Sequence, residues 1–86
     1  DQKDLIALYK GISHLYAGES REAALVLDIP IKSSEGIYKY PALYYQALSW
    51  INQEDTDKAI GILSALQEEA PMPYNKFAKE ILEEIN

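Results

Sequence analysis

The sequence predicts an all-α protein, and three observations support this fold class. Apolar residues recur at the spacing of an amphipathic helix in five segments, and no segment alternates with the period of a strand. Residues that favour helix ends or turns, such as Gly18, Pro30 and the APMP run at 70–73, separate these segments. Side chains of similar size recur 36 residues apart, which indicates a repeated helical hairpin.

The first two helices are predicted over residues 2–17 and from Ser20 to just before Pro30. The first carries a broad apolar face formed by Leu5, Ile6, Leu8, Tyr9, Ile12, Leu15 and Tyr16. Gly18 can adopt the left-handed conformation that ends a helix, and Ser20 is the expected cap of the next one. Proline lacks an amide hydrogen and clashes with the preceding turn, so the second helix is expected to stop before Pro30.

The third helix is predicted to follow a loop over residues 30–40. Two serines and Gly36 in this loop favour turns. The helix is expected to begin near Pro41, because proline fits the first turn of a helix, and Asn52 suits its end. Its apolar residues are Leu43, Tyr44, Ala47, Leu48, Trp50 and Ile51.

The last two helices follow in the remaining third of the chain. The fourth begins at Asp55 or Thr56, either of which can cap a helix, and reaches Glu69. Two prolines within residues 70–73 then break the helical pattern. A fifth helix, predicted over residues 73–86, carries Tyr74, Phe77, Ala78, Ile81, Leu82 and Ile85.

Composition and charge limit the class of function. The chain has 86 residues, 48% of them hydrophobic and 26% charged, as expected of one folded domain. Its formal charge of −6 argues against nucleic acid and gives no help in binding anionic lipid. No apolar run reaches the roughly 18 residues of a membrane span, so no direct membrane insertion is expected. The absence of cysteine excludes disulfides and thiolate metal sites. Because the chain begins at Asp1 without a methionine, we expect a fragment of a longer protein.

The repeat aligns residues of the same size and role. The equivalent pairs are Gly11 and Ala47, Ile12 and Leu48, Ser13 and Ser49, Leu15 and Ile51, Glu19 and Asp55, Ser20 and Thr56, Ala23 and Ala59, Val26 and Ile62, and Leu27 and Leu63. The small residues allow a neighbouring helix to approach closely. One hairpin cannot bury its apolar face alone, so such units stack and share a core.

With these residues the chain resembles the tetratricopeptide repeat family, whose 34-residue unit carries W-x2-L-G-x2-Y, then A-x3-F, then P. The matching residues are Leu43, Gln46, Ala47, Trp50, Ala59, Leu63 and Pro71 in the second unit, and Ala7, Lys10, Gly11, His14, Ala23 and Leu27 in the first. The first unit lacks both aromatic residues of the leading helix. The resemblance implies a single domain, an α-solenoid coiled as a right-handed superhelix. Repeat one would span 2–37, repeat two 38–71, and a capping helix 73–86.

In this family the leading helices of the hairpins line a concave groove that binds another protein. The resemblance therefore implies a non-catalytic scaffold for a partner peptide or helix. The seven tyrosines lie mostly on or just before the leading helices, so an apolar, tyrosine-bearing groove is expected. The residues predicted to face it are Leu8, Ile12, Leu15, Tyr16, Tyr44, Leu48, Ile51 and Asn52. The alternative is structural self-association, as a homodimer or within a longer array, with no separate ligand.

No residue pattern indicates catalysis, a metal site or a cofactor. His14 is the only histidine, and packing or a satisfied hydrogen bond explains it better than catalysis does. Glu80, Glu83 and Glu84 are spread along a solvated helix face, without the spacing of an EF-hand loop. We therefore expect a protein that is not an enzyme. The resemblance extends to short repeat domains attached to membrane anchors in bacterial envelope proteins, which makes a soluble, extracytoplasmic domain one expectation.

Overall fold

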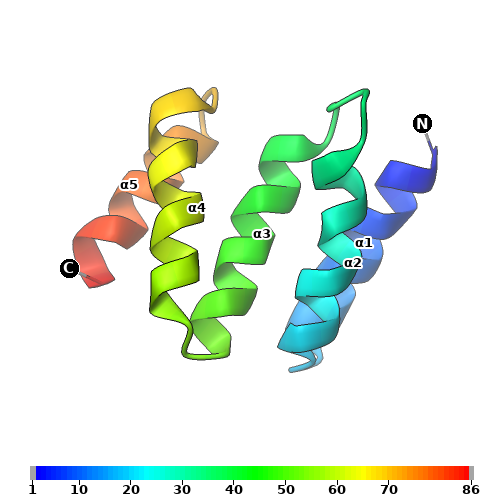
Figure 1. The fold of residues 1–86 in the computed structure, drawn as a ribbon, viewed down its shortest axis with the longest axis horizontal. Helices are drawn as coiled ribbons and strands as arrows, with labels where there is room; N and C mark the ends of the chain where they lie inside the picture. The colour runs from blue at the N-terminus through cyan, green and yellow to red at the C-terminus, as the bar shows by residue number, and fades with distance from the viewer. Residues whose placement is uncertain (1, 86) are drawn as a thin grey trace.

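The computed structural model describes residues 2–85 and folds them into helices alone (Figure 1). The helices are α1 (Gln2–Tyr16), α2 (Ser20–Lys32), α3 (Lys39–Asn52), α4 (Thr56–Glu69) and α5 (Tyr74–Ile85). No residue in the described range belongs to a strand. The predicted all-α class is confirmed.

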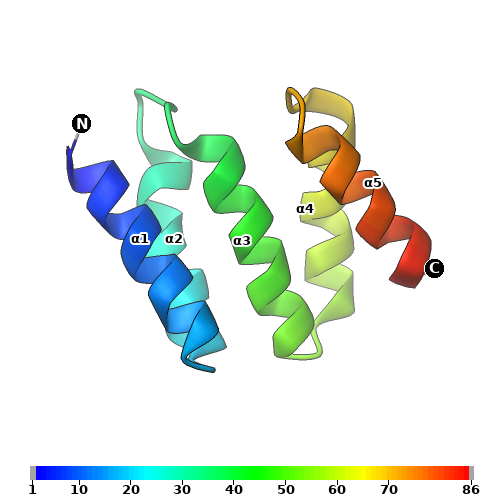
Figure 2. The same cartoon turned by 180° about the vertical axis from the view of Figure 1, so that it is seen from behind.

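The helices lie in two layers. Seen from behind, α1, α3 and α5 stand side by side in front of α2 and α4, and successive helices run in opposite directions (Figure 2). Within the described residues α3 contacts each of the other four helices, whereas α2 and α4 do not contact each other. We call α1, α3 and α5 the leading helices and α2 and α4 the trailing helices. The short connections make sequential helices antiparallel neighbours.

Two clusters of buried apolar side chains hold the layers together. The first joins the α1–α2 hairpin to α3 and contains Leu8, Leu27 and Ala42, flanked by Ile12, Ile31, Tyr38 and Tyr45. The second joins α3, α4 and α5 and contains Ala47, Ala59, Leu63, Leu66, Ala70, Ala78 and Leu82. The leading helix α3 contributes to both clusters from different faces. It therefore connects the two halves of the molecule.

The turns after α1 and α3 have the same backbone geometry. After α1, Gly18 has φ +81° and the Glu19 amide donates to the His14 carbonyl over 2.8 Å. After α3, 36 residues later, Glu54 has φ +63° and the Asp55 amide donates to the Trp50 carbonyl over 2.9 Å. This pairing of a left-handed residue with a bond across the last turn is a common way to end a helix.

The ends of α3 and α4 agree with the sequence. The structure ends α3 at Asn52 and has Pro41 in its first turn. Asp55 caps α4, because its carboxylate accepts a hydrogen bond from the Lys58 amide over 3.3 Å. Lys58 in turn lies 4.3 Å above the ring centroid of Trp50 and ties the start of α4 to α3.

The predicted end of the second helix before Pro30 is wrong. The structure continues α2 through Pro30 to Lys32 and shortens the following loop to residues 33–38. Proline removes one helical hydrogen bond. Burial offsets this loss, because Pro30 is almost completely buried and Ile31, on the added turn, packs against the first cluster.

The predicted cap at Ser20 is also wrong. Ser20 is the first residue of α2, and the cap position belongs to Glu19, which makes no capping hydrogen bond with its side chain. Instead the Glu19 carboxylate lies 2.7 Å from Nδ1 of His14. That carboxylate is therefore engaged across the turn rather than at the amides of α2.

A buried glutamine fixes the position of α3 against α2. Gln46 is only 7% exposed, and its amide nitrogen donates to the Ala24 carbonyl and to the Asp28 carboxylate, each over 2.9 Å. Gln53, two turns later, donates to the Ser20 carbonyl over 3.3 Å. These bonds can form in only one register of the two helices, so they add specificity to apolar packing.

Replacing Gln46 by Glu should destabilise the protein by about 1–3 kcal/mol at neutral pH. The new carboxylate would face the Ala24 carbonyl and the Asp28 carboxylate, both acceptors, so its pKa should be higher in the folded than in the unfolded protein. The destabilisation is therefore present when the carboxyl is ionised and should shrink as pH falls toward about 4. Urea unfolding of variant and wild type at several pH values measures it. The exposed Gln67→Glu is the control, and an equal effect of both changes would contradict the prediction.

Two helical glycines have opposite surroundings. A Cβ atom on Gly11 would lie 2.4 Å from Cγ and Cδ2 of Leu27, whereas a Cβ on Gly61 would meet no atom within 4 Å. Leu27 is fully buried. A side chain at position 11 would therefore require the buried Leu27 side chain to shift.

We expect Gly11→Ala to destabilise the protein despite the better helix propensity of alanine. Overpacking costs about 1–3 kcal/mol, and the propensity gain offsets about 1 kcal/mol of it. Gly61→Ala should stabilise α4 by about 0.5–1 kcal/mol, since it gains propensity without a clash. Chemical denaturation of the two variants checks both signs. A stabilising Gly11→Ala would mean that the helices do not approach this closely.

Candidate functional site

Four aromatic side chains form a cluster on the layer of leading helices. Tyr44 on α3 lies at its centre, with ring centroids 5.2 Å from Tyr45, 6.0 Å from Tyr74 and 5.6 Å from Phe77. Tyr74 and Phe77, one turn apart on α5, meet edge to face at 6.2 Å. We call Tyr44, Tyr45, Tyr74 and Phe77 the aromatic cluster. It joins α3 to α5, and none of its rings is fully buried.

Two phenol groups of the cluster, those of Tyr44 and Tyr45, are partly removed from water. Burial raises the pKa of Tyr44, and the nearby Tyr16 and Glu80 raise it further because they add negative charge. Burial likewise raises the pKa of Tyr45, with Tyr16 as the next cause. Tyr16, at the end of α1, acts on both phenols through its charge and makes no ring contact with the cluster.

The residues predicted to face a groove differ in how much surface they offer. Leu8 and Leu15 are buried, Ile12, Tyr44, Leu48 and Ile51 are half-buried, and Tyr16 and Asn52 are exposed. Leu8 and Ile12 belong to the first apolar cluster, and Tyr44 and Ile51 pack against the second. Of the predicted set, only Tyr44 belongs to the aromatic cluster. The 79% exposure of Tyr16 makes it the most accessible aromatic residue among them.

Sequence reasoning left Tyr45, Tyr74 and Phe77 out of the predicted groove. The repeat register assigned groove positions only within the two hairpins, so α5 received none. A signal was present, because Tyr74 and Phe77 are three residues apart and share one face of a helix. The position of Tyr45 beside Tyr44 depends on how α3 is rotated, which the sequence does not fix.

The titratable residues considered in the sequence lie at a turn and on α5. His14 and Glu19 form a hydrogen-bonded pair at a turn, and both side chains are partly exposed. This agrees with the interpretation of His14 as a hydrogen-bonded residue. Glu80, Glu83 and Glu84 are exposed on α5, as expected for a solvated face. Within residues 2–85, no group of three or more histidines and acidic residues could hold a metal ion.

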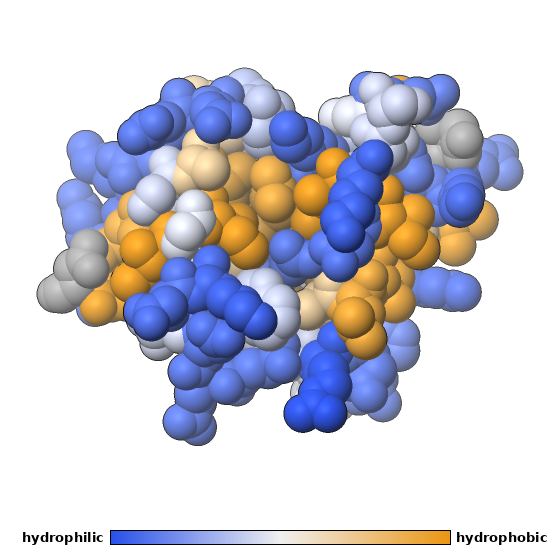
Figure 3. Space-filling model, in the orientation of Figure 1, coloured by the Kyte–Doolittle hydropathy of each residue, from blue (hydrophilic) through white to orange (hydrophobic). Residues whose placement is uncertain are grey.

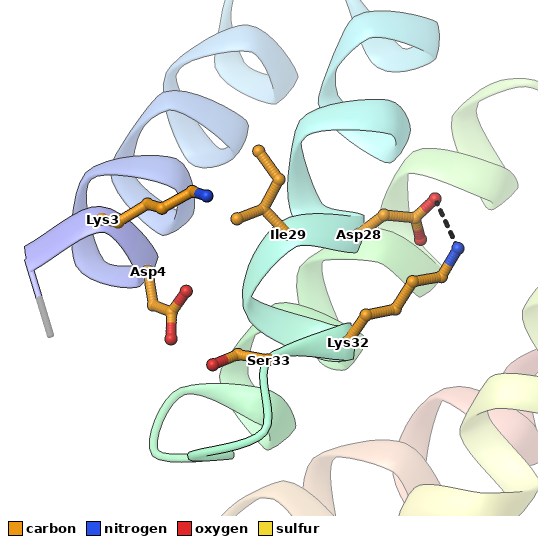
Figure 4. A pocket seen from close by; sticks show the side chains of 6 residues that line it. All are labelled: Lys3, Asp4, Asp28, Ile29, Lys32 and Ser33. Atoms are coloured by element: carbon orange, nitrogen blue, oxygen red, sulfur yellow. Dashed lines mark ion pairs between the residues drawn. The ribbon is translucent and has the colours of Figure 1, made fainter.

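Apart from the aromatic cluster, the structure has a hollow between α1 and α2. The space-filling view toward α2 and α4 shows apolar side chains exposed between polar ones (Figure 3). One hollow lies between the start of α1 and the end of α2 and is lined by Lys3, Asp4, Asp28, Ile29, Lys32 and Ser33 (Figure 4). Asp28 and Lys32 form an ion pair at 3.9 Å within it. Its charges are mixed, and its Asp28 is already engaged by Gln46.

Two further findings bear on the class of protein. No helix in the described part of the chain is long and apolar enough to cross a membrane. The chain matches no family model, no curated protein and no solved structure. A proposal for its function therefore rests on the chain's own residues.

The aromatic cluster predicts a late phase in the alkaline titration. Because the folded pKa values of Tyr44 and Tyr45 are raised, the folded state resists ionisation while the unfolded chain ionises near pH 10. The contribution of these two tyrosines to the free energy of unfolding is complete below that pH, and it is lost as pH rises through their pKa values in the folded protein. The double variant Tyr44→Phe, Tyr45→Phe should therefore lose less thermal stability between pH 9 and about 11 than the wild type.

Absorbance of the phenolate measures the same groups directly. The double variant should lack the latest part of the phenolate titration of the wild type. A double variant that keeps this latest part would contradict the raised pKa values of Tyr44 and Tyr45.

Proposed function

We propose that the chain is a short α-solenoid of the tetratricopeptide type that binds a segment of another protein. The leading helices carry the binding surface, and the aromatic cluster with Tyr16 is its centre. The partner segment docks as an extended peptide or a helix and inserts an apolar side chain beside Tyr44. The protein acts as a scaffold and performs no chemistry.

The equivalence of the two hairpins supports the repeat architecture. Gly11 and Ala47, 36 residues apart, are both buried where a trailing helix crosses a leading one. Leu27 and Leu63 are both fully buried opposite them. The turns at Gly18 and Glu54 share one geometry, although only one of the two positions is a glycine. Similar packing at equivalent positions is what stacked repeat units require.

The observation that carries the binding proposal is the partly exposed aromatic cluster. A purely structural cluster would be expected to lie under other side chains, but Phe77 is 37% exposed and the three tyrosines of the cluster are only half-buried. Tyrosine and phenylalanine supply large contact area and lose little conformational entropy on binding. Interface energy concentrates in such residues. Two leading helices, α3 and α5, carry the cluster, and the third, α1, carries the exposed Tyr16.

Charge near the cluster indicates the chemistry of the partner. Glu80 on α5 is close enough to Tyr44 to raise the pKa of its phenol, and the chain carries a formal charge of −6. A partner segment with a basic residue next to its apolar anchor would therefore be favoured. The same charge would speed its association at low salt.

Peptide selection tests this proposal and does not require a known partner. A displayed peptide library is selected against the chain, and the peptides obtained are titrated against variants. Tyr44→Ala should weaken binding by about tenfold or more, as for a central interface residue. Tyr16→Ala should weaken it by severalfold without changing the fold, because the ring is exposed. Selected sequences should share an aromatic or aliphatic anchor next to Lys or Arg.

Controls separate binding from folding and from self-association. Leu25→Ala removes an exposed apolar side chain on the trailing helix α2 and should leave the affinity unchanged. Circular dichroism shows whether Tyr44→Ala remains folded. Peptides whose affinity is unaffected by both Tyr16→Ala and Tyr44→Ala would refute the proposed surface. A homodimer in sedimentation that dissociates with Tyr16→Ala would favour self-association instead.

A further inference from the structure

The face of α3 that packs against α2 shows which residue types suit a contact between a leading and a trailing helix. Ala42, Gln46 and Ser49 follow one another at helical spacing on this face, and all three are buried. Gln46 donates to both Ala24 and Asp28 of α2. The face therefore combines a small residue that permits close approach with a polar side chain that binds a carboxylate.

The corresponding face of α5 is also covered. The residues 36 positions after Ala42 and Gln46 are Ala78 and Leu82, which are buried in the second cluster together with Leu63 and Leu66 of α4. Thus α3 and α5 each use the same face to receive the trailing helix that precedes them.

The corresponding face of α1 is open within the described residues. The positions 36 residues before Ala42 and Gln46 are Ile6 and Lys10, and Ile6 is 55% exposed. Lys10 and the neighbouring Ser13 are exposed as well, although the equivalent Ser49 is fully buried. Among the described helices, only α2 and α3 contact α1. The equivalent residues of the other two leading helices, Ala42 and Ala78, are buried under a trailing helix, whereas Ile6 is exposed. This difference indicates that the face of α1 around Ile6 is suited to receive a further helix.

The open face continues onto α2 as an apolar hollow. It has a volume of about 470 Å³ and is lined by Lys3, Ile6, Ala7, Lys10, Val26 and Ile29. The side chain of Lys3 extends from α1 toward Ile29 of α2 (Figure 4). We call these six residues the α1 edge face. Its centre is apolar, and its only charged lining residues are two lysines.

We propose that the α1 edge face binds an acidic amphipathic helix of a separate protein, in the way that α3 binds α2. The incoming helix presents a small residue and an apolar stripe to Ile6, Val26 and Ile29. It carries an aspartate or glutamate one turn after the small residue, as Asp28 follows Ala24. At the position of Gln46, α1 has Lys10, whose ammonium group pairs with that carboxylate more strongly than an amide does.

Charge also distinguishes this partner from a second copy of the chain. Symmetric pairing of two α1 edge faces would bring two copies each of Lys3 and Lys10 together, and like charges at an interface oppose association. An acidic helix meets the same lysines with opposite charge. The inference does not depend on the aromatic cluster, which lies elsewhere, around Tyr44 on α3.

A pair of synthetic helices tests the proposal. The acidic probe is a side-chain-stapled helical peptide with Ala, Leu, Asp and Ile at the positions that Ala24, Leu27, Asp28 and Ile31 occupy in α2. The matched probe has Lys in place of Asp. Fluorescence anisotropy measures the affinity of each for the wild type, for Ile6→Asp, for Lys10→Glu and for the control Tyr16→Ala.

The acidic probe should bind the wild type better than the lysine probe. Lys10→Glu should weaken the acidic probe by about fivefold and should strengthen the lysine probe. Ile6→Asp should weaken both by about tenfold or more, since it places a charge in the apolar centre. Tyr16→Ala should leave both affinities unchanged. Because Ile6 and Lys10 are exposed, the variants are expected to fold, and circular dichroism verifies it.

Three results would overturn the proposal. They are no binding of either probe, equal binding of both probes to wild type and to Lys10→Glu, and self-association of the wild type that Ile6→Asp abolishes in sedimentation. The last would identify a second copy as the occupant. If Tyr16→Ala weakens binding of the peptides selected from the library but leaves binding of the helical probes unchanged, the inference about the α1 edge face still holds. The two proposals can therefore fail independently of each other.

Discussion

The packing of α3 between two trailing helices is the constraint on which the rest of the structure depends. Among the described helices, α3 alone contacts all the others. One of its faces receives α2 through Ala42 and Gln46, and another receives α4 through Ala47. An isolated helix of this length is marginally stable in water, so the hairpins persist because they share these faces. The position of the aromatic cluster follows directly, since Tyr44 lies between the two faces.

Small residues and the buried side-chain amide of Gln46 specify this packing in different ways. Gly11, Ala23, Ala47 and Ala59 set how closely the helices approach, but alanine and glycine contacts permit sliding. The bonds of Gln46 to α2 stop such sliding, because a shift by one residue would leave a buried amide unsatisfied, at a cost of about 1–3 kcal/mol. No buried side-chain nitrogen or oxygen in the described residues lacks a partner. The small residues therefore set the distance between the helices, and the hydrogen bonds of Gln46 set the register of α3 against α2.

The sequence predicted most of the fold and only part of the candidate site, for physical reasons. Apolar periodicity and turn residues are local, so the helices, the Gly18 turn and the Asp55 cap could be found. The extension of α2 past Pro30 could not, because it depends on burial of that ring in the folded protein. Likewise, periodicity indicates which face of α1 is apolar, but it does not tell which neighbour covers it. Leu8 and Ile6 both belong to the apolar face predicted for this helix, but Leu8 lies in the core and Ile6 is exposed.

The two proposed surfaces differ in charge, and this difference argues that they bind different partners. The aromatic cluster lies beside Glu80 and favours a basic neighbour to its apolar anchor. The α1 edge face has Lys3 and Lys10 around an apolar centre and favours an acidic helix. A ligand suited to one surface is therefore electrostatically unsuited to the other. Both surfaces use α1, which carries Tyr16 at its end and Lys10 in its middle, so a helix docked on the edge would restrain the element that carries Tyr16. The stacking that builds the fold thus separates the two proposed surfaces, one centred on Tyr44 of α3 and the other on the edge of α1.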